Sequence, residues 1–217
     1  MADFKSRRVT MVDTQVRPSD VTKFQVIDAM LAIPREAYVP ADMQDVAYIG
    51  ENLILGAGRV VLEARSFAKM LDALDIGPSD LVLDVAAGLG YSSAVLAHMA
   101  EAVVAVEENA DFAQEAEANF VAQSVDNAAM ICASHVEGAT KYGPYDVIVV
   151  NGAVETMPTS LTDQLKEGGR MGAIFAVGQL CELRIGRKID GQMNWRLLCH
   201  ANAPVLDGFK REAAFQL

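Results

Sequence analysis

The sequence is short of basic residues. Its 217 residues include 18 Lys and Arg against 29 Asp and Glu, a formal net charge of −11 at pH 7. Such a charge offers no general attraction to the phosphates of nucleic acids or to the anionic surface of a membrane. We therefore expect neither nucleic acid nor a membrane as a partner.

Cysteine is also scarce, and long apolar runs are missing. Cys132, Cys181 and Cys199 are odd in number and lack metal-ligand spacing, so we expect buried thiols, no disulfide framework and no metal site. The polar Asp13–Gln15 follows the first basic residues, where a signal peptide would be apolar, and no run has the length of a membrane span. These absences favour a cytoplasmic protein.

The sequence does contain a glycine-rich turn between an apolar run and a helical pattern. The run Leu81–Val85 lacks polar alternation, as in a parallel strand that is covered on both faces. Ala86, Ala87, Gly88 and Gly90 follow, and such small residues let the backbone approach a ligand near the free N–H groups of a helix start. The stretch predicts a nucleotide-type cradle, although an ordinary glycine-rich turn also fits this motif taken alone.

Strands alternate with helices along most of the chain. The first helix is expected to be capped by Ser19 or Asp20 and to end at Pro34, and Ser66 is expected to open another. Later helices are expected over 92–100, around Phe112 and Phe120, and over 160–166, and strands over 81–85, 102–106, 128–133, 145–150 and 171–177. This alternation predicts an α/β fold with a mostly parallel, doubly wound sheet and ligands at the carboxyl ends of its strands.

The last part of the chain has a different pattern. Asp190-Gly191 is the expected turn of an antiparallel hairpin between 181–189 and 195–200. We expect a single domain over 1–217, with a helical and looped segment over 1–78, a cofactor-binding core over 79–178 and the C-terminal hairpin within 179–217.

An acidic pair ends the second predicted strand. Glu107 and Glu108 lie about 20 residues beyond the cradle, where a carboxylate can accept hydrogen bonds from both hydroxyls of a ribose. Glu107 is the better candidate because it lies nearer the strand end. An acidic pair at a strand end is otherwise commonly a solvated turn.

Two cofactor classes fit the cradle incompletely. A dinucleotide site prefers three glycines, but the third position of that motif is Ser93. An S-adenosylmethionine site uses an acidic residue followed by small residues, and Asp84 to Gly90 has that pattern, with Ala86 in place of the first glycine. The cradle alone therefore does not decide between the two.

The chain resembles the protein-L-isoaspartate O-methyltransferases over about residues 10–178. The resemblance is carried, in order and spacing, by Met11-Val12 with Gln15, Ile33–Pro40, Ala47-Tyr48, Gly56–Gly58, Val82–Tyr91, Pro144–Asp146 and Asp163–Arg170. It implies a Rossmann-like methyltransferase fold and S-adenosylmethionine as cofactor. It also implies, as acceptor, the side-chain carboxylate of an isoaspartyl residue in a damaged protein, and hence a role in protein repair.

The candidate acceptor loop departs from the family pattern. The family's Gly-Gln-Thr-Ile-Ser-Gln-Pro stretch aligns without gaps to Gly58–Ala64, so Val60 and Leu62 replace a threonine and a serine. Val61 lies between them, and both hydroxyls that orient an acceptor carboxylate are missing. We expect Arg59 to supply a charge partner for the acceptor, the other interpretation being a solvated loop arginine.

Further departures concern the cofactor. The family's Gly-Asp-Gly, whose aspartate meets the adenine amino group, aligns to Ala133-Ser134-His135. Ser134 can still accept a hydrogen bond there, His135 is expected to be a loop histidine, and Asn151 is expected to face the methyl donor. A methyltransferase is the first hypothesis. The alternatives are a degenerate member that binds the cofactor or a protein partner without isoaspartyl methylation, a methyltransferase for another acceptor, and a nicotinamide-dependent oxidoreductase.

Overall fold

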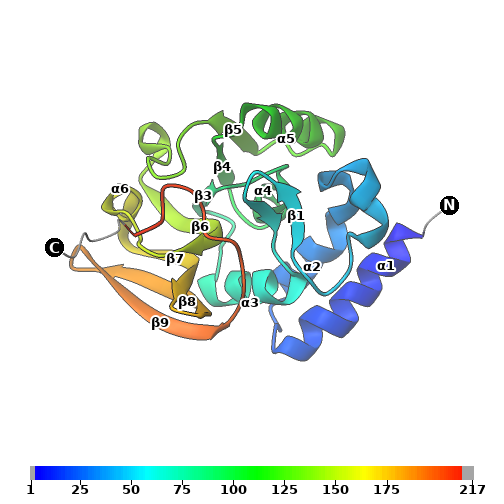
Figure 1. Cartoon of the computed structure of the whole chain (residues 1–217), viewed down its shortest axis with the longest axis horizontal. Coiled ribbons are helices and arrows are strands. Elements are labelled where there is room, and N and C mark those ends of the chain that lie inside the picture. Colours follow the sequence, from blue (N-terminus) through cyan, green and yellow to red (C-terminus); the bar gives the residue numbers. More distant parts are fainter. Residues whose placement is uncertain (1–2, 212–217) are drawn as a thin grey trace.

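The computed structural model describes residues 3–211, and its centre is a seven-stranded sheet (Figure 1). Two predicted segments, 1–78 and 179–217, extend beyond the described residues at positions 1–2 and 212–217. The strands are β3 (Leu81–Val85), β4 (Ala102–Glu107), β5 (Ala128–Cys132), β6 (Tyr145–Val154), β7 (Leu165–Val177), β8 (Leu180–Ile189) and β9 (Gln192–His200), in the order β5-β4-β3-β6-β7-β8-β9. The first five in that order are parallel and the last two antiparallel. The predicted fold class is therefore confirmed.

Six α-helices and a small hairpin surround this sheet within residues 3–211. The helices are α1 (Phe4–Met11), α2 (Phe24–Ala32), α3 (Ala64–Leu74), α4 (Tyr91–Ala97), α5 (Ala110–Ala122) and α6 (Thr159–Thr162). The hairpin pairs β1 (Leu53–Gly56) with β2 (Arg59–Val61) as a separate two-stranded sheet. Among the described residues, no helix has both the length and the apolar character that a membrane crossing requires.

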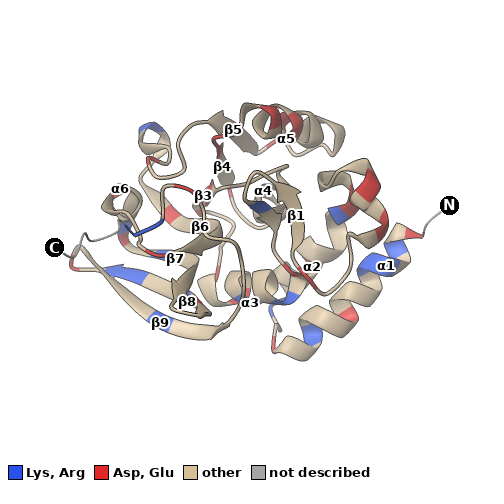
Figure 2. Cartoon of the chain, viewed as in Figure 1, with Lys and Arg blue, Asp and Glu red and all other residues tan. Residues whose placement is uncertain are grey.

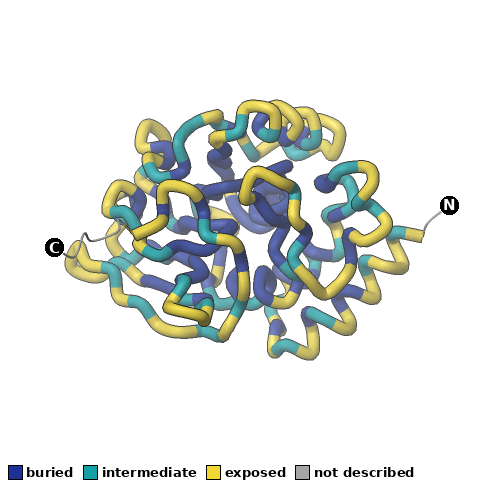
Figure 3. The backbone as a smooth tube through the Cα atoms, in the orientation of Figure 1, coloured by how far each residue is buried: buried dark blue, intermediate teal, exposed yellow. Residues whose placement is uncertain are grey.

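The central strands are buried on both faces, as their unbroken apolar sequences predict. Val82 and Val147 pack into one hydrophobic core, while Leu83 and Ile148 pack into the other, and all four side chains are fully buried. Figure 3 shows these strands as the dark centre of the molecule. A group of acidic residues lies outside this core, along the exposed face of α5 (Figure 2).

Several predicted boundaries are wrong. The helix expected over 160–166 ends at Thr162, because Leu165 already pairs with Tyr145 at the start of β7. Ser19 and Asp20 do not cap α2: the Ser19 hydroxyl donates to the preceding turn, and α2 begins after Lys23. Helix α3 likewise begins before Ser66, at Ala64.

Two other parts of the chain differ from the sequence prediction. Residues 4–19 form α1 and a continuing helical turn that the sequence pattern did not indicate. Of the three cysteines expected to be buried thiols, Cys132 is exposed, whereas Cys181 and Cys199 are half-buried, and all three are free.

After β9, the chain returns to the middle of the sheet (Figure 1, red). Val205 forms a parallel bridge with Ala153 near the end of β6, and Leu206 and Phe209 are buried. The Leu206 amide donates to the Ala153 carbonyl, and the amide of Glu155 donates to Phe209. The segment 201–211 thus covers the carboxyl end of β6.

Candidate active site

The predicted cradle joins β3 to α4 through left-handed backbone. Ala86, Gly88 and Gly90 have φ values of 59°, 56° and 93°. A Cβ atom on Gly90 would lie 2.6 Å from Cε1 of Phe120, so only glycine fits both the conformation and the space. The Ala87 amide donates to the Val106 carbonyl (3.2 Å), which ties the cradle to β4.

Asp84 is completely buried and forms hydrogen bonds with residues on either side of the cradle. The hydroxyls of Ser92 and Ser93, in the first turn of α4, each donate to its carboxylate at 2.6 Å. Asn151 donates to the same carboxylate at 2.7 Å. Burial raises the pKa of Asp84 to about 6, against the opposing effect of these hydrogen bonds. The carboxylate therefore positions the start of α4 from inside the protein.

Asn151 lies in an irregular part of β6, which continues beyond the predicted end at residue 150. Four residue steps from Val149 to Ala153 oppose two steps of β7, so the register shifts around Asn151. Its amide also donates to the Val85 carbonyl at 3.2 Å. The irregularity thus joins the carboxyl ends of β3 and β6.

Glu107 is the last residue of β4 and is fully buried, whereas the side chain of Glu108 is 36% exposed. The Glu107 carboxylate accepts from the backbone amides of Gly88 (3.1 Å) and Asn109 (2.9 Å) and from Arg59 Nε (3.1 and 3.2 Å). Burial acts to raise the pKa of Glu107, but the nearby His135, the hydrogen bond from the Asn109 amide and the charge of Arg59 hold that pKa below its usual value. An ionised carboxylate therefore lies beside the cradle.

His135 and Ser134 follow β5 at the same edge of the sheet. His135, expected to be an ordinary loop histidine, is fully buried, with Nδ1 at 3.2 Å from Arg59 Nη2 and Nε2 at 3.1 Å from the Glu108 amide. Ser134 is half-buried, and its carbonyl accepts from the Gly138 amide in the next turn. The signal in the sequence for His135 was its place directly after the third strand of the core.

The candidate acceptor loop lies against the cradle. Arg59, Val60, Val61 and Leu62 are between 2% and 7% exposed. With residues of the cradle, α3, α4 and β6, the last three enclose a cavity of about 10 Å³, lined further by Phe67, Ala87, Tyr91, Ser92 and Asn151. That volume holds roughly one water molecule. The fold thus brings three residues of the predicted acceptor loop against Ala87 and Asn151 of the predicted cofactor site.

Arg35 is a residue of this site that sequence reasoning missed. It is fully buried, and it donates to the carbonyls of Ala47 and Leu62, both at 2.8 Å. Its guanidinium also stacks on the ring of Tyr91, 4.8 Å from the centroid. Arg35 therefore fastens the end of the acceptor loop to α4, a role for which the only signal was its place in the Ile33–Pro40 segment.

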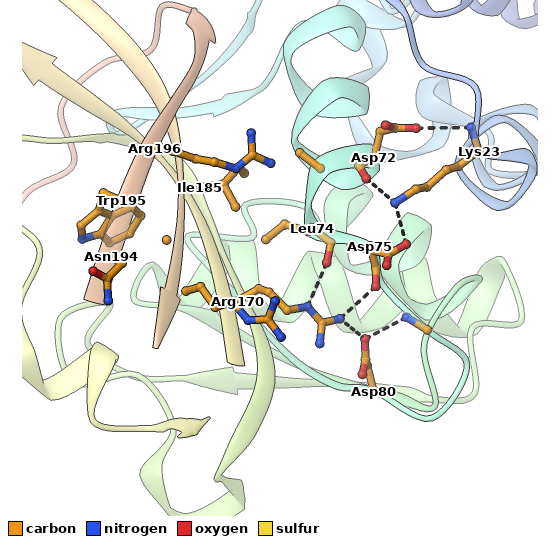
Figure 4. A pocket seen from close by; sticks show the side chains of 14 residues that line it. Lys23, Asp72, Leu74, Asp75, Asp80, Arg170, Ile185, Asn194, Trp195 and Arg196 are labelled. Carbon is orange, nitrogen blue, oxygen red and sulfur yellow. Dashed lines mark hydrogen bonds and ion pairs between the residues drawn. The ribbon is translucent and has the colours of Figure 1, made fainter. Parts of the chain in front are cut away.

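A wider groove of about 870 Å³ lies at the opposite end of the strands (Figure 4). There Arg170 donates to the carbonyls of Leu74 and Asp75 and to the Asp80 carboxylate, while Lys23 pairs with Asp75. None of the residues predicted for the site lines this groove. Its charged side chains tie α3 to the sheet.

The residues present fit S-adenosylmethionine. Ala86, Gly88 and Gly90 form the left-handed turn that leads into the start of α4, and Glu107 supplies a buried carboxylate of the kind that binds two ribose hydroxyls. A solved protein-L-isoaspartate O-methyltransferase superposes with a TM-score of 0.80 at 20% identity, over 94% of this chain and 66% of that one. A putative one from Plasmodium falciparum, in complex with S-adenosyl-L-homocysteine, gives 0.77 at 19% identity, over 95% and 99%. The fold and the site define a Rossmann-like, S-adenosylmethionine-dependent methyltransferase.

Sequence comparison identifies the family. Residues 7–198 match the family model of protein-L-isoaspartate(D-aspartate) O-methyltransferase. The protein-L-isoaspartate O-methyltransferase of Koribacter versatilis is 34% identical over 193 residues, 89% of this chain and 87% of that protein. The chain belongs to the protein-L-isoaspartate O-methyltransferase family.

Proposed function

We propose that this protein transfers a methyl group from S-adenosylmethionine to the side-chain carboxylate of an isoaspartyl residue in a protein or peptide. One observation carries the proposal: Val60–Leu62 of the candidate acceptor loop line a small cavity together with Ala87 and Asn151 of the predicted cofactor site, and the neighbouring Arg59 contacts Glu107. The name of the Koribacter versatilis relative supports the same acceptor.

Four parts of the chain would hold the cofactor. Glu107 would accept from the ribose hydroxyls, Ser134 would bind the adenine amino group, and the cradle Ala86–Gly90 would pass close to the rest of the molecule. Asn151 would lie beside the methyl donor, held there by Asp84. When bound, S-adenosylmethionine supplies a methyl group on a positively charged sulfur, which makes that carbon electrophilic.

The acceptor needs positioning rather than deprotonation. A carboxylate is already ionised at neutral pH, so methyl transfer requires no general base. An oxygen of the acceptor carboxylate would take the methyl group and become a methyl ester, and the donor would leave as a neutral sulfide, so no residue of this chain has to move a proton. Val60, Val61 and Leu62 would exclude water, and the charge of Arg59 would offset the cost of burying the acceptor carboxylate.

We further propose that the acceptor is polypeptide rather than nucleic acid or a membrane component, and that the reaction takes place in the cytoplasm. The net charge of −11 supports the first point, because it disfavours association with phosphates. The free thiols of Cys132, Cys181 and Cys199 support the second, because cysteines remain reduced in that compartment.

Two measurements on one preparation test the function. Calorimetry with S-adenosylmethionine and S-adenosylhomocysteine is expected to show binding of both. Methyl transfer is then measured to an isoaspartyl peptide and, as the matched control, to the same peptide with an ordinary aspartate. Transfer to the isoaspartyl peptide alone is the expected result. Binding without transfer to it would favour another acceptor or a degenerate member, in keeping with the loss of both loop hydroxyls.

A further inference from the structure

Arg59 occupies the carboxylate on which a ribose would bind. A carboxylate has about four lone-pair sites. Oε1 of Glu107 accepts from the Asn109 amide and from Arg59 Nε, and Oε2 accepts from the Gly88 amide and from the same Nε. Two ribose hydroxyls can therefore bind both oxygens only if one of these donors leaves.

Arg59 is the donor that can leave. The Gly88 amide belongs to the cradle itself, and Asn109 is fixed because its side chain caps α5 through the amides of Asp111 and Phe112. Arg59 reaches Glu107 from a different element, across 48 residues of sequence, and its Nη2 also pairs at 2.8 Å with Glu108, whose side chain is 36% exposed. It is thus a side chain on a separate hairpin, whereas the other two donors are main chain of the binding site.

The hairpin β1–β2, which carries Arg59, is a separate element from the sheet that carries Glu107. It is a two-stranded sheet of its own, without ladder hydrogen bonds to the main sheet. Its tip, Gly56–Gly58, is exposed and has left-handed backbone at all three residues. Leu55 of this hairpin covers the cradle, since its Cδ1 lies 3.0 Å from where a Cβ of Gly88 would be. Entry of a ligand beneath it therefore requires the Leu55 side chain to move.

We propose that Arg59 is exchanged between Glu107 and the acceptor. The ribose hydroxyls of the donor displace the guanidinium from Glu107, and the freed guanidinium binds the carboxylate of the acceptor. The second half of this inference rests on the proposed function. Glu107 and Glu108 share the Arg59 charge until the donor displaces it from Glu107, so donor and acceptor bind with positive cooperativity, and the coupling is reciprocal.

The first test is the affinity for S-adenosylhomocysteine, measured by calorimetry on wild type and Arg59→Gln. Removal of the competing guanidinium is expected to tighten binding by about fivefold or more. Arg184→Gln is the matched control, because Arg184 is a half-buried arginine paired with Glu182 on β8, and its binding is expected to be unchanged. Equal or weaker binding by Arg59→Gln would overturn the exchange.

The displacement of Arg59 from Glu107 can also be tested on the wild-type protein, so this test does not depend on the folding of a variant. By NMR, the Nε–H of Arg59 is expected to be protected from exchange with water in the free protein, because it is buried on Glu107. Addition of S-adenosylhomocysteine is expected to abolish that protection. Protection that persists in the complex would show that Arg59 stays on Glu107 and would refute the proposal.

The second test measures binding of an isoaspartyl peptide with and without S-adenosylhomocysteine. Wild type is expected to bind the peptide about fivefold or more tightly with it, and Arg59→Gln to lose that gain. Equal affinity in both conditions, with methylation intact, overturns the coupling and leaves the proposed function standing. If Arg59→Gln binds S-adenosylhomocysteine more tightly but no isoaspartyl methylation is found, the displacement of Arg59 from Glu107 stands. The proposal that isoaspartate is the acceptor then fails.

Discussion

Asp84 and Asn151 are 67 residues apart in the sequence, yet Asn151 Nδ2 donates to Asp84 Oδ1 at 2.7 Å in the interior. The bond joins β3 to the irregular part of β6, directly beneath the cradle. Because Ser92 and Ser93 bind the other oxygen, one buried carboxylate sets the positions of two strands and a helix start. Burial of this carboxylate has a consequence for stability.

As the pH rises from about 4 to about 6, the wild type is expected to lose stability relative to Asp84→Asn. The pKa of Asp84 is raised to about 6 in the folded protein, so in this window the folded state holds a proton that the unfolded state has lost. Above pH 6 the buried charge costs about 3 kcal/mol. Urea unfolding at pH 4 and at pH 7.5 measures the difference.

At pH 7.5, Asp84→Asn is expected to be more stable than wild type by about 1 to 3 kcal/mol, since the amide removes the charge and keeps the shape. At pH 4 the gain is expected to disappear. Asp28→Asn, at a surface carboxylate half exposed beside His98, is the control and is expected to show no such gain. An Asp84→Asn protein less stable than wild type at pH 7.5 would contradict the argument.

Ala86→Gly is expected to stabilise the protein by about 0.5 to 1 kcal/mol. Ala86 has a φ of 59°, where an L side chain is strained and glycine is not. Ala94→Gly in α4 is the matched control, and it is expected to cost about 1 kcal/mol because its helical backbone disfavours glycine. Thermal unfolding of both variants tests this, and a loss of stability in Ala86→Gly would show that the strain is absent.

Gly90→Ala is expected to cost about 2 to 4 kcal/mol and to abolish cofactor binding. The new Cβ meets left-handed strain at a φ of 93° and a contact of 2.6 Å with Phe120. Gly56→Ala separates the two effects, because Gly56 has a φ of 99° and a Cβ added there would have nothing within 4 Å. Equal losses of stability in the two variants would show that Phe120 gives way.

Arg35→Lys is expected to destabilise the protein by about 3 kcal/mol. A lysine cannot hold the carbonyls of Ala47 and Leu62 together in the plane that also stacks on Tyr91. Arg7→Lys is the control, since Arg7 is 43% exposed beside Asp45 and the exchange is expected to change stability by less than about 0.5 kcal/mol. Urea unfolding that gave similar values for both would argue against Arg35 as the fastening of the acceptor loop.

Local patterns were sufficient to predict the core of the fold. The run Leu81–Val85, the small residues after it and the acidic pair that ends the next strand are each encoded within a few neighbouring residues. Glu107 in particular is set by its spacing from the cradle, and the parallel pairing of β3 with β4 brings the two together. Periodicity and turn chemistry predict such features because they depend on sequence neighbours.

Contacts between segments that are distant in the sequence could not be predicted from periodicity or turn chemistry. Arg59 meets Glu107 and His135 only because the hairpin β1–β2 folds over the cradle, and these partners lie 48 and 76 residues away in the sequence. Helix α1 was missed because Met11 is its one buried residue, which leaves no apolar face to detect. The end of α6 was set by the pairing of Leu165 with Tyr145 rather than by its own sequence.

The segment 201–211 covers part of the sheet but is synthesised after it. Synthesis proceeds from the amino to the carboxyl end, so this segment emerges after every strand of the sheet. Yet Leu206 packs where any Cβ on Gly152 would be, next to Asn151. A nascent chain that has made the whole sheet therefore still exposes the apolar surface beside Asn151 until residues 201–211 follow and cover it.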